Sequence, residues 1–205
     1  MKKTVLIVIR HGETVWNLEK RIQGHLDSDL TDRGYAQARS LARAFSTIRI
    51  DALYCSDLGR AVKTVAAIES ATGLSATHLA CLRESNLGVL QGKTREEIEE
   101  DFPDEYDLFR LREPDFVLPE GESLVQRHQR AIFCLSKLVM EHDGKVVCAV
   151  THGGILDSLL RHTLDISLKE SRRFSISNCA INTFWITDGI WEMVEWGNVS
   201  HLNGI

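Results

Sequence analysis

Apolar positions along the chain follow two different periods, which predicts an alternation of strands and helices. Residues 5–9 and 146–150 are apolar runs without alternation, rich in β-branched side chains and bounded by polar residues. Strands buried on both faces of a parallel sheet have this pattern. Shorter strands are predicted at residues 52–55 and 75–79, and a hairpin at residues 180–196 around Asp188-Gly189.

Between these strands, apolar residues recur at helical spacing. Helix starts are predicted after Thr31, after Ser56 or Asp57, and at the capping boxes of Thr94 and Ser123. The apolar face of the first helix would comprise Tyr35, Ala38, Leu41, Ala42 and Phe45. A further helix is predicted at residues 155–164. This order predicts one α/β domain over residues 1–205, a three-layer sandwich with a mostly parallel sheet and helices on both faces.

Residues 93–122 differ from the rest of the chain. They are rich in charge and contain all three prolines, Pro103, Pro114 and Pro119. No buried strand pattern runs through them. We expect this stretch to be a lid-like excursion over the surface of the domain.

Composition narrows the possible classes of protein. A hydrophobic content of 43% and a charged content of 26% are ordinary for a globular protein and exclude a disordered one. The net charge of −5 indicates no basic face, so neither nucleic acid nor an anionic membrane is an expected partner. The first apolar run ends at Arg10, which makes it too short for a signal peptide, and no run approaches the ~20 apolar residues of a membrane span.

The cysteines point to a compartment. There are five, an odd number, widely spaced and without a C-x-x-C pair. This usage predicts free thiols in a reducing compartment, and hence a cytoplasmic protein.

Each of the two apolar runs leads into a histidine followed by glycine. His11-Gly12 follows Arg10, and His152-Gly153 follows Thr151. Ligands of open α/β sheets bind beyond the carboxyl ends of the strands, where glycine N–H groups and helix N-termini favour anions. From position alone, each histidine could also be a hydrogen-bonded core residue.

A metal site is the other interpretation of paired histidines, and the neighbouring residues argue against it. Arg10 is a poor neighbour for a cation, and no third ligand stands at a typical spacing. The acidic run at residues 27–32 lacks the glycine and distal glutamate of a calcium loop, so a turn and helix cap are expected there.

The run Arg10-His11-Gly12-Glu13-Thr14 resembles the histidine phosphatase superfamily, in the branch that contains cofactor-dependent phosphoglycerate mutases. Further resemblances follow in the family's order over nearly the whole chain: Asn17 with Arg21-Ile22-Gln23-Gly24, the segment 30–38, Ser56 to Thr64 around Arg60, Arg83-Glu84 before Gly88 and Gly92, Pro119 to Ser123, and Thr151-His152-Gly153-Gly154. The chain departs from the family at residues 88–92, where an aromatic and a second acidic residue are often found.

The resemblance implies a phosphoglycerate mutase-like fold and a set of roles. His11 would be the nucleophile and form a phosphohistidine, while His152 stabilises the transferred group. Glu84 would protonate the leaving oxygen and then activate water. The phosphate would be held by Arg10 and Arg60, with Asn17, Gln23, Gly24, Thr14 and Gly153 as further phosphate- or substrate-binding residues. No metal or other cofactor is expected.

Three functional hypotheses are compatible with these residues. About 26 residues separate Gly92 from Pro119, whereas the mutases of the family carry a longer insertion there. This favours a phosphatase acting on a small phosphorylated metabolite, with a cofactor-dependent phosphoglycerate mutase as the alternative. A catalytically silent binding module is the third hypothesis, which the presence of His11, His152 and both arginines disfavours. The physiological substrate and the oligomeric state, monomer or dimer, stay open.

Overall fold

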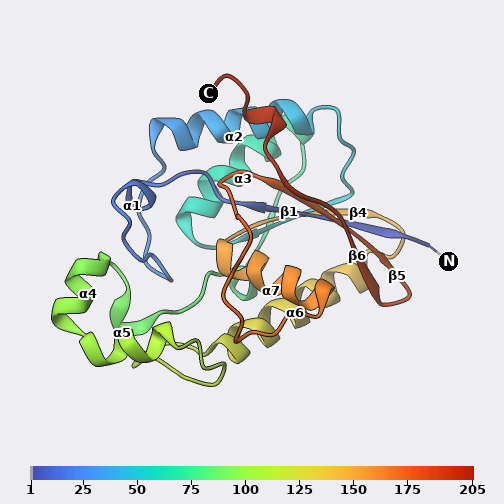
Figure 1. Cartoon of the computed structure of the whole chain (residues 1–205). Helices are drawn as coiled ribbons and strands as arrows, with labels where there is room; N and C mark the ends of the chain where they lie inside the picture. The colour runs from blue at the N-terminus through green and yellow to red at the C-terminus, as the bar shows by residue number, and fades with distance from the viewer. Residues whose placement is uncertain (1) are drawn as a thin grey trace.

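The centre of the molecule is a six-stranded sheet in the order β3-β2-β4-β1-β5-β6, seen in a computed structural model that describes residues 2–205 (Figure 1). Strands β1 to β4 run parallel, β5 runs antiparallel to β1, and β6 completes a hairpin with β5. The strands are β1 (Thr4–Arg10), β2 (Ala52–Ser56), β3 (Thr77–Leu79), β4 (Val146–Thr151), β5 (Ile181–Thr187) and β6 (Ile190–Asn198). The predicted mostly parallel sheet is confirmed.

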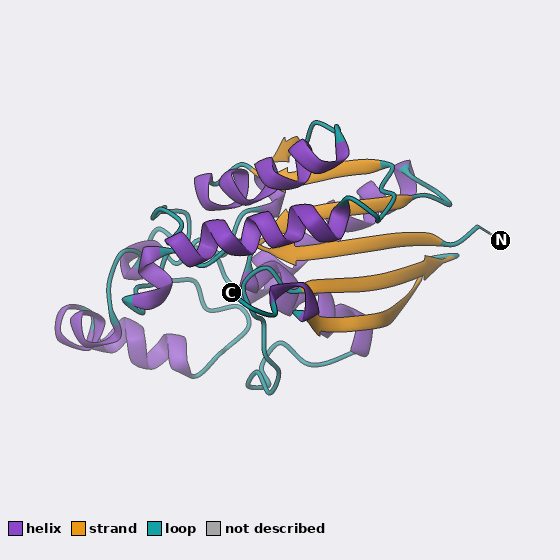
Figure 2. Cartoon of the chain, turned by 90° about the horizontal axis from the view of Figure 1, so that it is seen from above, coloured by secondary structure: helices purple, strands orange, loops and turns teal. Residues whose placement is uncertain are grey.

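Helices cover both faces of this sheet (Figures 1 and 2). They are α1 (Val15–Leu18), α2 (Asp32–Phe45), α3 (Gly59–Thr72), α4 (Arg95–Asp101), α5 (Pro103–Arg110), α6 (Leu124–Glu141) and α7 (Gly153–Leu164). On one face Ile7 and Ile9 pack in a cluster with residues of α2 and α3. On the other face Leu6 and Val8 pack with residues of α6 and α7. Because side chains alternate along a strand, β1 feeds both apolar layers and the three-layer architecture is confirmed.

Most helix caps follow the sequence, with one correction. Thr31, Thr94 and Ser123 each cap a helix through a side-chain oxygen. Helix α3, however, has no side-chain cap from Ser56 or Asp57. A carboxylate from a distant loop, that of Asp27, instead accepts the N–H of Gly59 at 2.6 Å.

Tyr35 was expected on the apolar face of α2 and lies at the surface instead. Tyr35 is 37% exposed, and its hydroxyl donates to Asp29 at 2.9 Å. The buried face of α2 includes the polar residues Gln37 and Ser40 beside Leu41. Gln37 can be buried because its Oε1 accepts the N–H of Glu13.

The cysteine prediction was wrong for two of the five thiols. Cys81 and Cys134 form a disulfide that joins the short helix η1 (Ala80–Leu82) to α6, while Cys55, Cys148 and Cys179 are free and buried. The two partners are 53 residues apart in the sequence and meet because η1 packs on α6. Spacing along the chain gives no indication of such a contact. None of the helices described here is long and apolar enough to cross a bilayer.

Residues 93–122 form α4, α5 and connecting loops beyond the carboxyl end of β1 (Figure 1). Ile98 and Leu118 of this segment form a small apolar cluster with Leu90, which precedes it in the chain. Gly88, which precedes this region in the chain, packs closely against the backbone of Pro119. Its φ is +47°, and a Cβ at this position would lie 1.8 Å from the carbonyl oxygen of Pro119.

Gly88→Ala should therefore destabilise the protein more than Gly73→Ala. Gly73 also has a positive φ, of +73°, but no atom lies within 4 Å of a Cβ placed there. In Gly73→Ala, backbone strain should lower the free energy of unfolding by about 1–2 kcal/mol. In Gly88→Ala, the clash should lower it by about 1–3 kcal/mol more. Urea unfolding of the two variants checks this. Equal losses would contradict the packing of Gly88 against Pro119.

Candidate active site

The two histidines that follow the apolar runs meet at the carboxyl ends of two central strands, β1 and β4. Strands β1 and β4 are adjacent and parallel, with Arg10 opposite Thr151, and the N–H of His11 donates to the carbonyl of Thr151 at 2.9 Å. The next residue on each strand is therefore a histidine. The ring centroids of His11 and His152 are 5.2 Å apart, and both side chains are buried.

Hydrogen bonds fix the ring of His11 and its proton. Its Nδ1 lies 2.7 Å from the carbonyl oxygen of Gly12, which can only accept, so Nδ1 carries the hydrogen. The N–H of Gly12 in turn donates to Thr64 Oγ1 at 2.9 Å, and Asn178 donates to the carbonyl of His11 at 3.0 Å. With Nδ1 protonated, Nε2 of the neutral ring has a free lone pair.

His152 has the complementary arrangement. Its Nε2 lies 2.7 Å from Ser56 Oγ, and that oxygen also accepts the N–H of Leu58 at 3.3 Å. Ser56 can donate its hydroxyl hydrogen to His152 Nε2, and in that tautomer the ring hydrogen lies on Nδ1. His152 Nδ1 is buried and has no partner among the described residues. A buried donor without a partner is rare in proteins and is explained by a ligand that accepts from it.

Two arginines flank the histidines, Arg60 fully buried and Arg10 partly buried. Arg60 is 1% exposed and donates to the carbonyls of Gly24 and Leu26, both at 2.7 Å, and to the carboxylate of Asp27 at 2.8 Å. Arg10 donates to the carbonyl of Ile176 at 2.6 Å. The Nε atoms of both arginines are buried without a partner in residues 2–205. Each guanidinium thus keeps an N–H free for an anion.

These charges and the burial set the protonation of both imidazoles. Burial lowers the pKa of His11 well below its ordinary 6.5, and the positive charges of Arg10 and Arg60 lower it further. The pKa of His152 is also well below that value, through burial and then the positive charge of Arg60, with Arg10 acting in the same direction. Both rings are therefore neutral at pH 7, and the positive charge of the site resides on the arginines.

Glu84 reaches the same place from the loop after η1. Its carboxylate accepts the N–H of Gly154, with both oxygens at 3.0 Å, and the N–H of Ser85 at 2.7 Å. A Cβ on Gly153 would lie 3.7 Å from Glu84 Oε2 and 3.8 Å from Arg10 Nε. The carboxylate therefore stands at the N-terminus of α7, close to Arg10.

Of the other predicted phosphate-binding residues, some have side-chain amides without hydrogen bonds and some have polar groups already bonded within the protein. Gln23 is buried, and its side-chain amide has no hydrogen bond to the described residues. Asn17 uses Oδ1 to accept from Thr14 and Asn178, which leaves its NH₂ group unbonded. Thr14 caps α1 with its hydroxyl, and Gly24 supplies a carbonyl to Arg60 from a left-handed turn. Thr14 and Gly24 therefore support the site through structural contacts.

Three supporting residues had no assigned function in the sequence. Asp27 binds Arg60 and the start of α3, Thr64 holds the N–H of Gly12, and Ser56 orients His152. Ser56 and Thr64 stand in the segment around Arg60, and Asp27 stands in an acidic run expected to form a turn and a cap. A cap on a helix 32 residues away has no local sequence pattern.

The site has donors for an anion rather than ligands for a cation. Across residues 2–205, no three histidine, cysteine, aspartate or glutamate side chains gather as metal ligands would. Glu13 and Glu122, the other acids near the motifs, are engaged by Thr31 and Arg33 and by Arg130, respectively.

Comparison with known proteins places this geometry in a family. The histidine phosphatase superfamily (branch 1) matches residues 6–199. A phosphoglycerate mutase-like protein 4 and a metal-independent phosphoserine phosphatase, both of Arabidopsis thaliana, are 37% and 34% identical, over 96% and 98% of this chain and 86% and 84% of theirs. The solved structure of Bacillus stearothermophilus YhfR superposes with a TM-score of 0.91 at 31% identity, covering 97% of this chain and 99% of that one. The buried pair of histidines, with its flanking arginines, belongs to a member of the histidine phosphatase superfamily.

Proposed function

We propose that this chain hydrolyses phosphomonoesters of small metabolites through a phosphohistidine on His11. One observation carries the proposal. The neutral ring of His11 has its Nδ1–H bonded to the Gly12 carbonyl and its Nε2 free, beside Arg10 and Arg60, each of which keeps a buried Nε–H unbonded. A buried nucleophile with a lone pair and positive charge beside it is what transfer of a phosphoryl dianion requires.

In the first step, the N–H groups of Arg10 and Arg60 bind the non-bridging oxygens of the phosphoryl group. His11 Nε2 attacks phosphorus while the bond to the ester oxygen breaks, and Glu84 gives its proton to that leaving oxygen. His152 Nδ1–H donates to a phosphoryl oxygen and stabilises the charge that develops there. Asn17 and Gln23 offer amide N–H groups to the same oxygens.

In the second step, water replaces the departed alcohol. The Glu84 carboxylate, now without its proton, accepts a proton from the water as the oxygen attacks phosphorus. The bond between phosphorus and Nε2 of His11 breaks, which releases inorganic phosphate and restores the neutral imidazole. Because Gly154 and Ser85 hold the carboxylate through backbone N–H groups, one side chain can serve both steps without moving far.

The relatives support a hydrolase and keep a mutase as the second candidate. The phosphoserine phosphatase of Entamoeba histolytica has a TM-score of 0.86 with this chain at 28% identity. A mutase differs only in passing the phosphoryl group to a second hydroxyl. The short α4 and α5 of residues 93–122 leave little chain to enclose that second substrate, which favours water as the acceptor.

The phosphoenzyme is the direct test. Brief mixing with labelled p-nitrophenyl phosphate, in the presence of a strong chelator, should leave acid-labile, base-stable phosphate on His11. His11→Ala should keep the fold and lose both label and turnover. Label on a serine or cysteine, or activity that depends on one added divalent ion, would contradict the mechanism.

The lowered pKa of His11 predicts how kcat/KM depends on pH in acidic solution. Protonation of Nε2 would remove the nucleophile, and a pKa well below 6.5 means that this happens only in clearly acidic solution. The kcat/KM for p-nitrophenyl phosphate, corrected for ionisation of the substrate, should therefore stay level as the pH falls through 6.5. A loss of activity centred at 6.5 would show a solvated, ordinary histidine.

Gly154→Ala should disable Glu84 without touching its carboxyl group. A Cβ on Gly154 would lie 2.1 Å from Glu84 Oε1, so the carboxylate must shift. General acid catalysis is worth about 10²–10⁴-fold, chiefly for poor leaving groups. The variant, like Glu84→Gln, should lose far more kcat on an alkyl phosphate than on p-nitrophenyl phosphate.

The matched control is Gly153→Ala, whose Cβ would lie 3.7 Å from the carboxylate, in ordinary contact. It should lose much less than Gly154→Ala on the alkyl phosphate. Equal losses on both substrates, in either Gly154→Ala or Glu84→Gln, would assign the acid role to another residue.

A further inference from the structure

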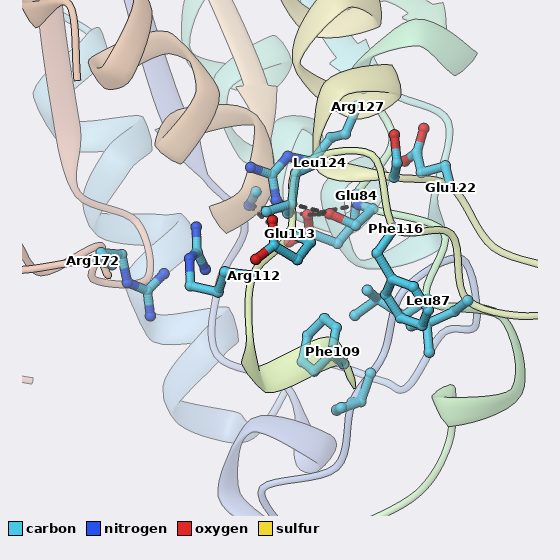
Figure 3. Close-up of a pocket in the computed structure, with 15 residues that line it drawn as sticks. Glu84, Leu87, Phe109, Arg112, Glu113, Phe116, Glu122, Leu124, Arg127 and Arg172 are labelled. Carbon is cyan, nitrogen blue, oxygen red and sulfur yellow. Dashed lines mark hydrogen bonds between the residues drawn. The ribbon is translucent and has the colours of Figure 1, made fainter. Parts of the chain in front are cut away.

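A cavity of about 330 Å³ opens beside Glu84 and Gly154 (Figure 3). Glu84 is the group that would protonate the leaving oxygen, so the alcohol part of the substrate must extend from there. The size is at the lower end for small-molecule sites, which suits a compact alcohol. The apolar part of the wall consists of Ile22, Leu87, Phe109, Phe116, Leu118 and Leu124.

Most charged groups of the wall already have partners. Glu113 pairs with Lys169 at 2.7 Å, and Glu122 pairs with Arg130. Arg127 pairs with Asp157 at 2.9 Å. These groups are neutralised within the protein and leave the cavity without a strong charge of their own.

Arg112 and Arg172 are different. The Nη2 of Arg112 donates to the carbonyl of Leu168 at 3.2 Å, but its Nε is buried with no partner, and neither arginine has an ion pair within residues 2–205. Figure 3 shows both guanidinium groups on one side of the cavity, with Phe109 and Phe116 on the other. Burial lowers the pKa of Arg112, the Asp157 carboxylate raises it, and the charges of Arg161 and Arg127 lower it further. Asp157 itself is already paired with Arg127 and Arg161. Arg112 and Arg172 are thus the two arginines of the wall without a direct ion pair among the described residues.

Arg112 directly follows the C-cap of α5, and its φ of +55° lies in the left-handed region that commonly ends a helix. The end of α5 therefore sets the position of this side chain at the wall. The neutral polar groups of the wall offer little to a neutral polyol. Ser123 Oγ caps α6, and Ser85 Oγ accepts from Arg127.

We propose that Arg112 and Arg172 recognise a second anionic group on the substrate, a carboxylate or a second phosphate, while the apolar wall packs on its short carbon skeleton. This proposal rests on the proposed function, since it assigns the cavity to the leaving alcohol. It makes the two arginines specificity residues, remote from the bond that breaks.

The test compares three substrates that share a three-carbon skeleton and differ at the far carbon. These are 3-phosphoglycerate, with a carboxylate, glycerol 1,3-bisphosphate, with a second phosphate, and glycerol 3-phosphate, with a hydroxyl. At least one of the two anionic substrates should exceed glycerol 3-phosphate in kcat/KM by tenfold or more, and which one does so distinguishes carboxylate from phosphate.

Arg112→Met and Arg172→Met should each lower kcat/KM for the preferred anionic substrate by roughly ten- to hundredfold, as expected for loss of a charge-assisted hydrogen bond. Glycerol 3-phosphate and p-nitrophenyl phosphate should be unaffected. Arg173→Met is the matched control, because Arg173 is exposed next to Arg172 and does not line the cavity. Circular dichroism checks the fold of each variant, and Arg172→Met, on an exposed loop residue, keeps the test independent of any misfolding of Arg112→Met.

Equal kcat/KM for all three substrates, or equal losses on charged and uncharged ones, would overturn the anion subsite while leaving the hydrolase intact. The absence of both p-nitrophenyl phosphate turnover and phosphohistidine would instead overturn the proposed function, and the subsite with it.

Discussion

The pairing of β1 with β4 is the constraint on which the site depends. The two strands are separated by more than 130 residues of chain, yet their parallel register sets Arg10 opposite Thr151. The histidines that follow are thereby held with their rings 5.2 Å apart. Both strands are buried on two faces, so a shift in register would move apolar side chains out of both layers at once. The cores that stabilise the sheet therefore also fix the distance between the imidazoles.

The second constraint is that a buried arginine needs hydrogen-bond acceptors, and loop residues supply them. A buried guanidinium is costly unless its N–H groups find acceptors. Arg60 obtains two carbonyls and the carboxylate of Asp27, which at the same time binds the N-terminus of α3. The buried Nε–H of Arg60 and that of Arg10 are left for the ligand. Their positive charge lowers the pKa of His11, so the groups proposed to bind phosphate also keep the nucleophile unprotonated.

How much of this follows from sequence depends on whether a contact is local. The buried strands were predictable because unbroken apolar runs rich in β-branched residues are typical of strands covered on both faces. Thr31, Thr94 and Ser123 were predictable as caps because their partners are three residues away. The ordered resemblance to a family supplied the candidate site residues. Asp27 as a cap for α3, the outward turn of Tyr35 and the Cys81–Cys134 pairing depend on how distant segments pack, and no local pattern records that.

The cavity beside Glu84 was beyond sequence reasoning for the same reason. Residues 93–122 were recognisable as a charged excursion, but nothing in them distinguishes Arg112 from the surface arginines around it. The fold brings Arg112 to the same cavity as Arg172, which lies 60 residues further along the chain. The fold also pairs two other charged residues of the wall, Arg127 with Asp157 and Glu113 with Lys169. The apolar cluster of this region forms one side of the same cavity.

The protonation of His11 decides the proposed mechanism, because a neutral ring with its proton on Nδ1 leaves Nε2 as the nucleophile. Long-range ¹H–¹⁵N NMR of histidine-labelled enzyme, with His11 assigned by its loss in a His11→Gln variant, measures this in the free enzyme. At pH 6 we expect a neutral ring protonated at Nδ1. A cationic ring, or a neutral ring with its proton on Nε2, would contradict the proposed mechanism.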